Sequence, residues 1–215
     1  GQKVMAKLPE KGLVGLVYWE NGFRNLTNSK RPITKFEDLE GVKLRVMQNN
    51  VFLDSFKALG ANAVPMAFSE LFGALETKTV DGQENPIAHI YASKLHEVQK
   101  YMSLTYHAYT TNVVVMNLKK FQDLKPEHQK AIFDSLAEAR DWERQLNRKL
   151  DGEALAKIKA AGVQVEENPD REAFRKVVAD DFTVLTPVIG LSVFSPGDPS
   201  LGQKVFSSMQ TNEDE

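Results

Sequence analysis

The chain has 215 residues, of which 42% are hydrophobic and 26% charged, and its formal net charge is -2 at pH 7. These values are typical of a folded globular protein with one sizeable core or two small ones, and they argue against disorder of the whole chain. The charge gives no overall basic field for nucleic acid, zero cysteines exclude disulfides and cysteine nucleophiles, and no apolar run approaches the length of a transmembrane helix.

The first segment predicts a buried strand followed by a short helix. Residues 13–19 form a continuous apolar run, which is typical of a strand covered on both faces, and this strand should end at residues 20–22. A capping-box pattern in residues 33–37 predicts a short helix, and Gly41 is placed to close it.

The next strand and helix predict an anion-attracting edge. In residues 42–46 apolar and basic side chains alternate, so we expect a strand in which Arg45 points away from the buried face near the carboxyl end. Asn49 or Asn50 is a suitable N-cap for a helix that ends at Gly60, which would place free backbone N–H groups close to Arg45. The carboxyl ends of strands are the usual ligand edge of an open α/β sheet.

Alternation of strands and helices continues through the middle of the chain. Residues 63–66 read as a short strand and Ser69 as the beginning of a helix. Pro86 suits the first position of a helix, so Asn85, the residue before it, is predicted to be the N-cap of a helix over residues 87–95. Residues 110–116 are rich in β-branched side chains and predict a further strand.

From Pro126 the pattern changes to one long helix. Apolar residues recur at helical spacing until Gly162, which supplies a stop, and residues 151–152 (Asp-Gly) should weaken or bend the middle. Residues 163–165 predict a short strand, and residues 171–181 predict a last helix. A helix of this length could brace two lobes of a protein.

Two arginines and one amide suggest a site for an acid. Arg24, Arg45 and Asn85 each lie where a regular element is expected to end, and crevices form at such ends. The guanidinium group presents a planar fork of donors that matches a carboxylate, and it stays charged at any ordinary pH.

Five motifs, in order along the chain, resemble those of one protein family. The chain is similar to the solute-binding receptors of tripartite ATP-independent periplasmic (TRAP) transporters over about residues 13–176. The motifs that carry the resemblance are Gly-Phe-Arg at 22–24, Asn-Ser-Lys-Arg-Pro-Ile at 28–33, Lys-Leu-Arg-Val at 43–46, Pro-Met-Ala-Phe-Ser-Glu at 65–70 and Val-Asp-Gly-Gln-Glu-Asn-Pro at 80–86.

The resemblance implies an α/β, two-lobed, periplasmic-binding-protein-like fold with the long helix as a brace. It implies a periplasmic receptor, without its signal peptide, that closes on a small organic acid such as a sugar acid and delivers it to the membrane permease of a TRAP transporter. The receptor itself would not span the membrane, and neither a cofactor nor a nucleic-acid partner is expected. The sequence leaves open whether the ligand is a sugar acid, a keto acid or a dicarboxylate.

Family roles carry over to matching residues. The resemblance implies that Arg45 pairs with the ligand carboxylate, Arg24 lines the pocket, the ring of Phe68 packs against the ligand and the amide of Asn85 contacts its carboxylate end. Gln48 completes the set of ligand-binding candidates. Taken singly, these side chains are more simply explained as loop or surface charges, a helix cap and a core ring, and only their joint order favours a pocket.

The domain organisation is also predicted. Residues 1–22 and 111–150 are expected to be the remainder of lobe one, residues 23–110 and 151–185 to form lobe two, and residues 186–215 to form a tail. Family members begin with further strands and helices of the first lobe, so we expect this chain to be N-terminally truncated and its first lobe incomplete.

An enzyme acting on a small carboxylate substrate is the alternative. No metalloprotease, hydrolase-elbow, Walker or dinucleotide motif is present in the sequence. Glu84 is the one carboxylate considered as a general base, and His89 and His96 lack a carboxylate at metal-ligand spacing. The sequence therefore favours a binding protein without catalysis.

Overall fold

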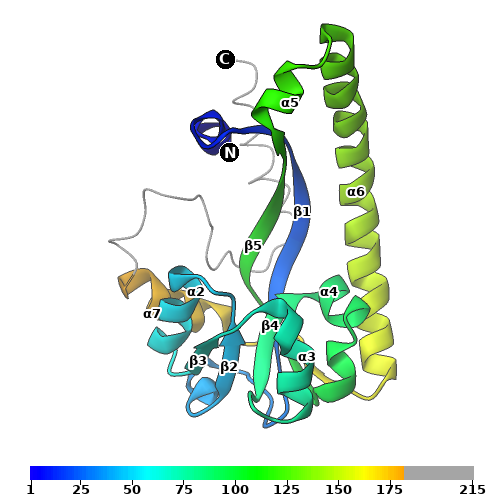
Figure 1. The fold of residues 1–215 in the computed structure, drawn as a ribbon. Coiled ribbons are helices and arrows are strands. Elements are labelled where there is room, and N and C mark those ends of the chain that lie inside the picture. The colour runs from blue at the N-terminus through cyan, green and yellow to red at the C-terminus, as the bar shows by residue number, and fades with distance from the viewer. Residues whose placement is uncertain (182–215) are drawn as a thin grey trace.

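The computed structural model describes residues 1–181, and the predicted tail, residues 186–215, lies outside the described residues. The described strands form one mixed sheet of six strands in the order β3-β2-β4-β1-β5-β6 (Figure 1). The strands are β1 (Leu13–Asn28), β2 (Lys43–Val46), β3 (Asn62–Pro65), β4 (Gly82–Pro86), β5 (Tyr101–Asn117) and β6 (Gln164–Glu166). Strand β2 runs parallel to β3 and β4, β5 runs parallel to β6, and β1 is antiparallel to β4 and β5.

The helices follow the predicted alternation. The α-helices are α1 (Gln2–Met5), α2 (Asn50–Ala58), α3 (Phe68–Glu76), α4 (Ile87–Ala92), α5 (Leu118–Gln122), α6 (Pro126–Ala160) and α7 (Arg171–Asp181). Short 3-10 turns lie at η1 (Leu8–Lys11), η2 (Phe36–Leu39) and η3 (Leu95–Val98). Asn49 is the N-cap of α2, since its side chain accepts a hydrogen bond from the backbone N–H of Val51 at 2.8 Å. Gly41 and Gly162 follow η2 and α6 with positive φ angles of 69° and 91°, as closing glycines do.

Helices cover both faces of the part of the sheet that lies at the bottom of Figure 1. One buried cluster joins strand residues such as Leu44 and Val46 to Phe52 and Phe56 of α2 and Phe174 of α7. A second cluster joins the sheet to α3, α4 and the last third of α6. Every buried residue of the two clusters lies within 26–108 or 154–178, which is inside the range predicted for lobe two.

Strands β1 and β5 extend out of this body as a long two-stranded ribbon, with α6 alongside (Figure 1). The prediction that the first strand ends at residues 20–22 is wrong, because β1 continues to Asn28. Pairing with β5 on one side and β4 on the other keeps this part of the chain extended. Gly22, at φ 110°, follows a shift in the β1–β5 register rather than a turn. The expected cover on both faces of residues 13–19 is also wrong, since Val17 alone is buried there.

Side chains of α6 bind the edge of β1 that β4 leaves open. The β1–β4 register begins at Arg24, and before that residue the backbone N–H of Glu20 donates to Glu143 at 3.0 Å. The amide of Asn147 donates to the Glu20 carbonyl at 3.3 Å, and Arg148 pairs with the Glu20 carboxylate at 3.1 Å. Helix α6 is continuous through residues 151–152, where the sequence predicted weakening or bending. Asp151 there accepts a hydrogen bond from the backbone N–H of Ala88 at 2.8 Å.

The predicted lobes do not have separate sheets in the described residues. The predicted crossing points, Gly22 and Thr110, are register partners inside the continuous strands β1 and β5. The division into two lobes stays a prediction.

Candidate functional site

The predicted site residues gather at one edge of the sheet. Strands β2, β3 and β4 are parallel, so their carboxyl ends meet at the same edge. Arg45 lies in β2, Phe68 begins α3 after β3, and Asn85 lies near the end of β4. Arg24 of β1 is the register partner of Pro86, the last residue of β4. Pairing of distant segments therefore places all four residues at this edge.

Arg45 is a buried cation. The alternation of β2 points it away from the cluster that contains Leu44 and Val46, as predicted, but that side is covered too and Arg45 is only 3% exposed. Its Nε and Nη2 both donate to the backbone carbonyl of Met66, at 2.9 and 2.7 Å. No carboxylate among residues 1–181 forms an ion pair with Arg45. Burial lowers the pKa of Arg45, the charge of Glu84 opposes this shift, and the charge of Arg24 adds to it.

Phe68 lies next to this guanidinium and faces solvent. Its side chain is 48% exposed, so the simpler interpretation of Phe68 as a core residue is wrong. The Cζ of Arg45 lies 6.0 Å from the centre of the Phe68 ring, within the range of a cation–π contact. The ring of His89 also meets Phe68 edge to face, at 6.5 Å. An exposed ring packed on a buried cation is available to contact a ligand.

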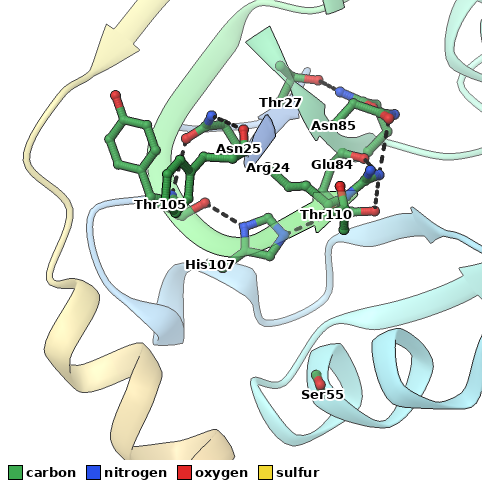
Figure 2. Close-up of polar contacts among 12 residues, drawn as sticks. Arg24, Asn25, Thr27, Ser55, Glu84, Asn85, Thr105, His107 and Thr110 are labelled. Carbon is green, nitrogen blue, oxygen red and sulfur yellow. Dashed lines mark hydrogen bonds and ion pairs between the residues drawn. The ribbon is translucent and has the colours of Figure 1, made fainter. Parts of the chain in front are cut away.

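Arg24 is buried in the middle of β1 rather than placed in a loop at a strand end, as the sequence predicted. It is 2% exposed, and its side chain makes a two-point ion pair with Glu84 (Figure 2). Nε donates to Oε2 of Glu84 at 2.5 Å, and Nη2 donates to Oε1 at 2.8 Å. The guanidinium fork of Arg24, a side chain predicted to line the ligand pocket, is therefore occupied by a carboxylate of the protein.

Glu84 connects Arg24 to His107 (Figure 2). The Nε2 of His107 lies 3.0 Å from Oε2 of Glu84, and its Nδ1 lies 2.8 Å from the hydroxyl of Thr105. Burial alone would raise the pKa of Glu84, but Arg24 and His107 outweigh it and hold the pKa below its usual value. Burial lowers the pKa of His107, so the neutral ring can donate to Glu84 and accept from Thr105. A lowered pKa is the wrong direction for a general base working near neutral pH, which argues against the enzymatic role considered for Glu84.

Asn85 is a strand residue, so its prediction as a helix cap is wrong. Strand β4 is paired on both sides and stays extended through Pro86, which is the N-cap of α4. The Oδ1 of Asn85 accepts from Arg24 Nη2 at 3.0 Å, and its Nδ2 donates to Gln83 at 2.6 Å. The amide is thereby fixed in orientation beside Arg24.

The five candidates fall into three places. Arg24 and Asn85 contact each other, Arg45 and Phe68 contact each other, and Gln48 lies exposed in the connection between β2 and α2 without a hydrogen bond in the described part of the chain. The guanidinium of Arg24 lies over Phe52 of α2, at 5.6 Å, whereas Arg45 lies against the beginning of α3. The two arginines thus approach the strand ends from opposite faces of the sheet.

Two residues of this network, Glu84 as an ion-pair partner and His107, were missed by the sequence analysis. A carboxylate inside a buried strand needs a buried cation, and this argument could have paired Glu84 with Arg24. No local pattern distinguishes His107 from other histidines in strands.

Comparisons with known proteins agree on one family. The sequence model of bacterial extracellular solute-binding proteins, family 7, matches residues 1–183. The Escherichia coli (strain K12) 2,3-diketo-L-gulonate-binding periplasmic protein YiaO is 43% identical over 174 residues, which is 81% of this chain and 53% of YiaO. The chain spans about half the length of the curated relatives that it matches.

Solved structures give the same result. The sugar acid binding protein DctPAm from Advenella mimigardefordensis, in complex with galactonate, is 49% identical with a TM-score of 0.81, over 84% of this chain and 59% of that one. A TRAP periplasmic solute binding protein from Polaromonas, bound to D-erythronate, is 42% identical with a TM-score of 0.82, over 85% of this chain and 60% of that one. No helix among residues 1–181 combines the length and the apolar character needed to cross a membrane.

Proposed function

The chain belongs to the bacterial extracellular solute-binding protein family 7, and from this premise we propose that it captures a small organic acid in the periplasm and delivers it to a TRAP membrane permease. The family match confirms the resemblance that the five motifs indicated, and the solved neighbours confirm the α/β, periplasmic-binding-protein-like fold class. The family is described as extracellular solute-binding proteins, and the Polaromonas structure is described as a TRAP periplasmic solute binding protein. We propose the same role, without catalysis, for this chain.

The observation that carries the proposal is the state of Arg45. A buried guanidinium without a carboxylate partner in residues 1–181 has lost water contacts and regained little charge compensation. A ligand carboxylate at this edge would supply that compensation with two oxygens in the geometry of the fork. The exposed ring of Phe68 would then pack against the carbon atoms next to the carboxylate.

Arg24 and Asn85 have a different part in the proposal. Because Glu84 already neutralises Arg24, we assign the main charge contact to Arg45 and the role of orienting the Asn85 amide to Arg24. The amide of Asn85 would contact the carboxylate end of the ligand, and Gln48, exposed at the same edge, would contact it from the β2–α2 connection.

A sugar acid is the ligand class that the relatives favour. The names of three of them specify 2,3-diketo-L-gulonate, galactonate and D-erythronate, which all carry one carboxylate and several oxygen functions on a carbon chain. We propose a ligand of this class. A ligand site of this kind lies between two lobes that close around it, and the two-lobed division of this protein is part of the proposal.

The test is isothermal titration calorimetry with galactonate and D-erythronate, on protein expressed from its complete gene. Loss of a bidentate contact to a buried carboxylate costs about 2 to 5 kcal/mol, so Arg45→Ala should weaken binding by at least about tenfold. Arg45→Lys should fail as well, because an ammonium group cannot reproduce the fork. Mass spectrometry of ligand carried through purification would identify the natural acid.

Lys43→Ala is the matched control. Lys43 lies in the same strand, is exposed, and loses the same unit of charge, yet its side chain has no contact with the site. It should bind both acids as the unmodified protein does. If Arg45→Ala binds as tightly as Lys43→Ala, Arg45 is not the carboxylate residue and the proposal fails.

A further inference from the structure

His89 contacts Phe68, which in turn contacts Arg45. It lies in the first turn of α4, directly after β4, and therefore at the same edge of the sheet as the other site residues. Its side chain is exposed, and its ring meets the ring of Phe68 edge to face at 6.5 Å. Neither ring nitrogen has a hydrogen-bond partner among residues 1–181. The ring therefore packs against Phe68 while its polar atoms stay available.

The charge state of His89 suits a neutral partner. Partial burial lowers the pKa of His89, and the nearby charge of Arg24 lowers it further. Near neutral pH the ring is therefore uncharged, with one nitrogen as a donor and the other as an acceptor. Such a ring adds little attraction for a second carboxylate, whereas a hydroxyl group can both donate to it and accept from it.

The three side chains thus present three different surfaces, and Phe68 contacts both of the others. Arg45 supplies a cation, Phe68 an exposed apolar face, and His89 a neutral pair of hydrogen-bonding atoms. A hydroxylated acid presents the complementary series along its own chain, namely a carboxylate, C–H groups and hydroxyl groups. An unsubstituted fatty acid of the same length matches only the first two surfaces.

We propose that His89 is a specificity-determining residue that binds a hydroxyl group of a sugar acid whose carboxylate lies on Arg45. This inference rests on the proposed function, because it needs the acid to be bound at Arg45. It adds a residue to the site and a reason for the site to prefer hydroxylated acids. His89 entered the sequence analysis only as a poor metal ligand.

The experiment compares galactonate with hexanoate, which has six carbons and one carboxylate but no hydroxyl groups. His89→Phe keeps an aromatic ring against Phe68 and removes both nitrogens. One lost hydrogen bond should weaken galactonate binding about tenfold and leave hexanoate binding unchanged. His128→Phe is the matched control, since His128 is exposed near the beginning of α6, away from the site, and it should change neither affinity.

A second measurement separates ligand contact from a structural role. In nitrogen-detected NMR, the ring nitrogens of His89 should shift when galactonate is added and shift much less with hexanoate. Equal losses for both acids in His89→Phe would mean that His89 only supports Phe68, and unchanged galactonate binding would mean that it contributes nothing; either result overturns the inference. If the unmodified protein binds neither acid, the proposed function has failed and this inference fails with it. Weaker binding of galactonate alone in His89→Phe, together with weaker binding of both acids in Arg45→Ala, supports both.

Discussion

Replacing Glu84 by Gln tests whether Arg24 depends on a carboxylate of the protein. The substitution keeps the size of the side chain and removes its charge. In the folded protein Glu84 is fully buried and accepts two hydrogen bonds from Arg24, at 2.5 and 2.8 Å, while Nε2 of His107 lies 3.0 Å away. Arg24, at 2% exposure, cannot recover water contacts when its partner loses its charge.

The expected cost is large relative to the stability of a domain. Removing one partner of a buried ion pair costs about 3–5 kcal/mol, because the other charge stays buried without compensation. The amide oxygen of Gln can still accept one hydrogen bond from Arg24, so we expect a value near the lower end, about 3 kcal/mol. With a urea dependence of about 1–3 kcal/mol per molar, the unfolding midpoint should fall by about 1–3 M.

The assay is urea unfolding followed by circular dichroism, at several pH values. The folded-state pKa of Glu84 is lowered, so its ion pair stabilises the protein above the ordinary pKa of about 4.3 and this stabilisation is lost as the pH falls through the folded value. The stabilities of the two proteins should therefore begin to converge as the pH falls below about 4.3, and they should become equal only below the folded-state pKa. Glu138→Gln, on an exposed position of α6, should change stability by less than about 0.5 kcal/mol. A midpoint for Glu84→Gln as high as that of Glu138→Gln would refute the conclusion that Glu84 neutralises Arg24.

Local signals in the sequence predicted much of the fold. The N-cap at Asn49 or Asn50, the stop at Gly162 and the last helix over residues 171–181 were predicted from signals close by in the sequence, and the structure has each of them, with Asn49 as the N-cap. The length of β1 and the strand at β4 depend on pairing between segments far apart in the sequence, which no local pattern reports.

The sequence predicted which residues form the site, but not which of them contact each other. Arg45 and Phe68 lie next to each other, and their contacts with a ligand stay predictions. The sequence could place Arg45 near a strand end because the alternation of residues 42–46 is a local signal. The ion pair between Arg24 and Glu84 could not be read in this way, because it joins two strands whose adjacency arises only from the sheet order. Such adjacency also decides which of the two arginines has an ion-pair partner among residues 1–181.

Three further substitutions test other parts of the structure. Gly82→Ala should destabilise the protein by about 1–3 kcal/mol in thermal unfolding, because a Cβ there would lie 2.4 Å from the carbonyl oxygen of Thr27; unchanged stability would mean that β1 and β4 are less closely packed. Trp142, 65% exposed on α6, should promote self-association of the 215-residue chain, so Trp142→Gln should lower the mass measured by light scattering at high concentration. Asp151→Asn should stabilise the protein at pH 7.5 but not at pH 4. Burial raises the pKa of Asp151 to about 6, although the hydrogen bond from the N–H of Ala88 opposes this shift. Between about pH 3.9 and 6 the folded state therefore holds a proton that the unfolded state has released. The stability of the protein declines as the pH rises through this range. The amide oxygen of Asn can still accept from Ala88, so the variant keeps the hydrogen bond and loses the pH-dependent cost. If the melting temperatures of the variant and of the unmodified protein are equal at both pH values, the pKa of Asp151 is not raised.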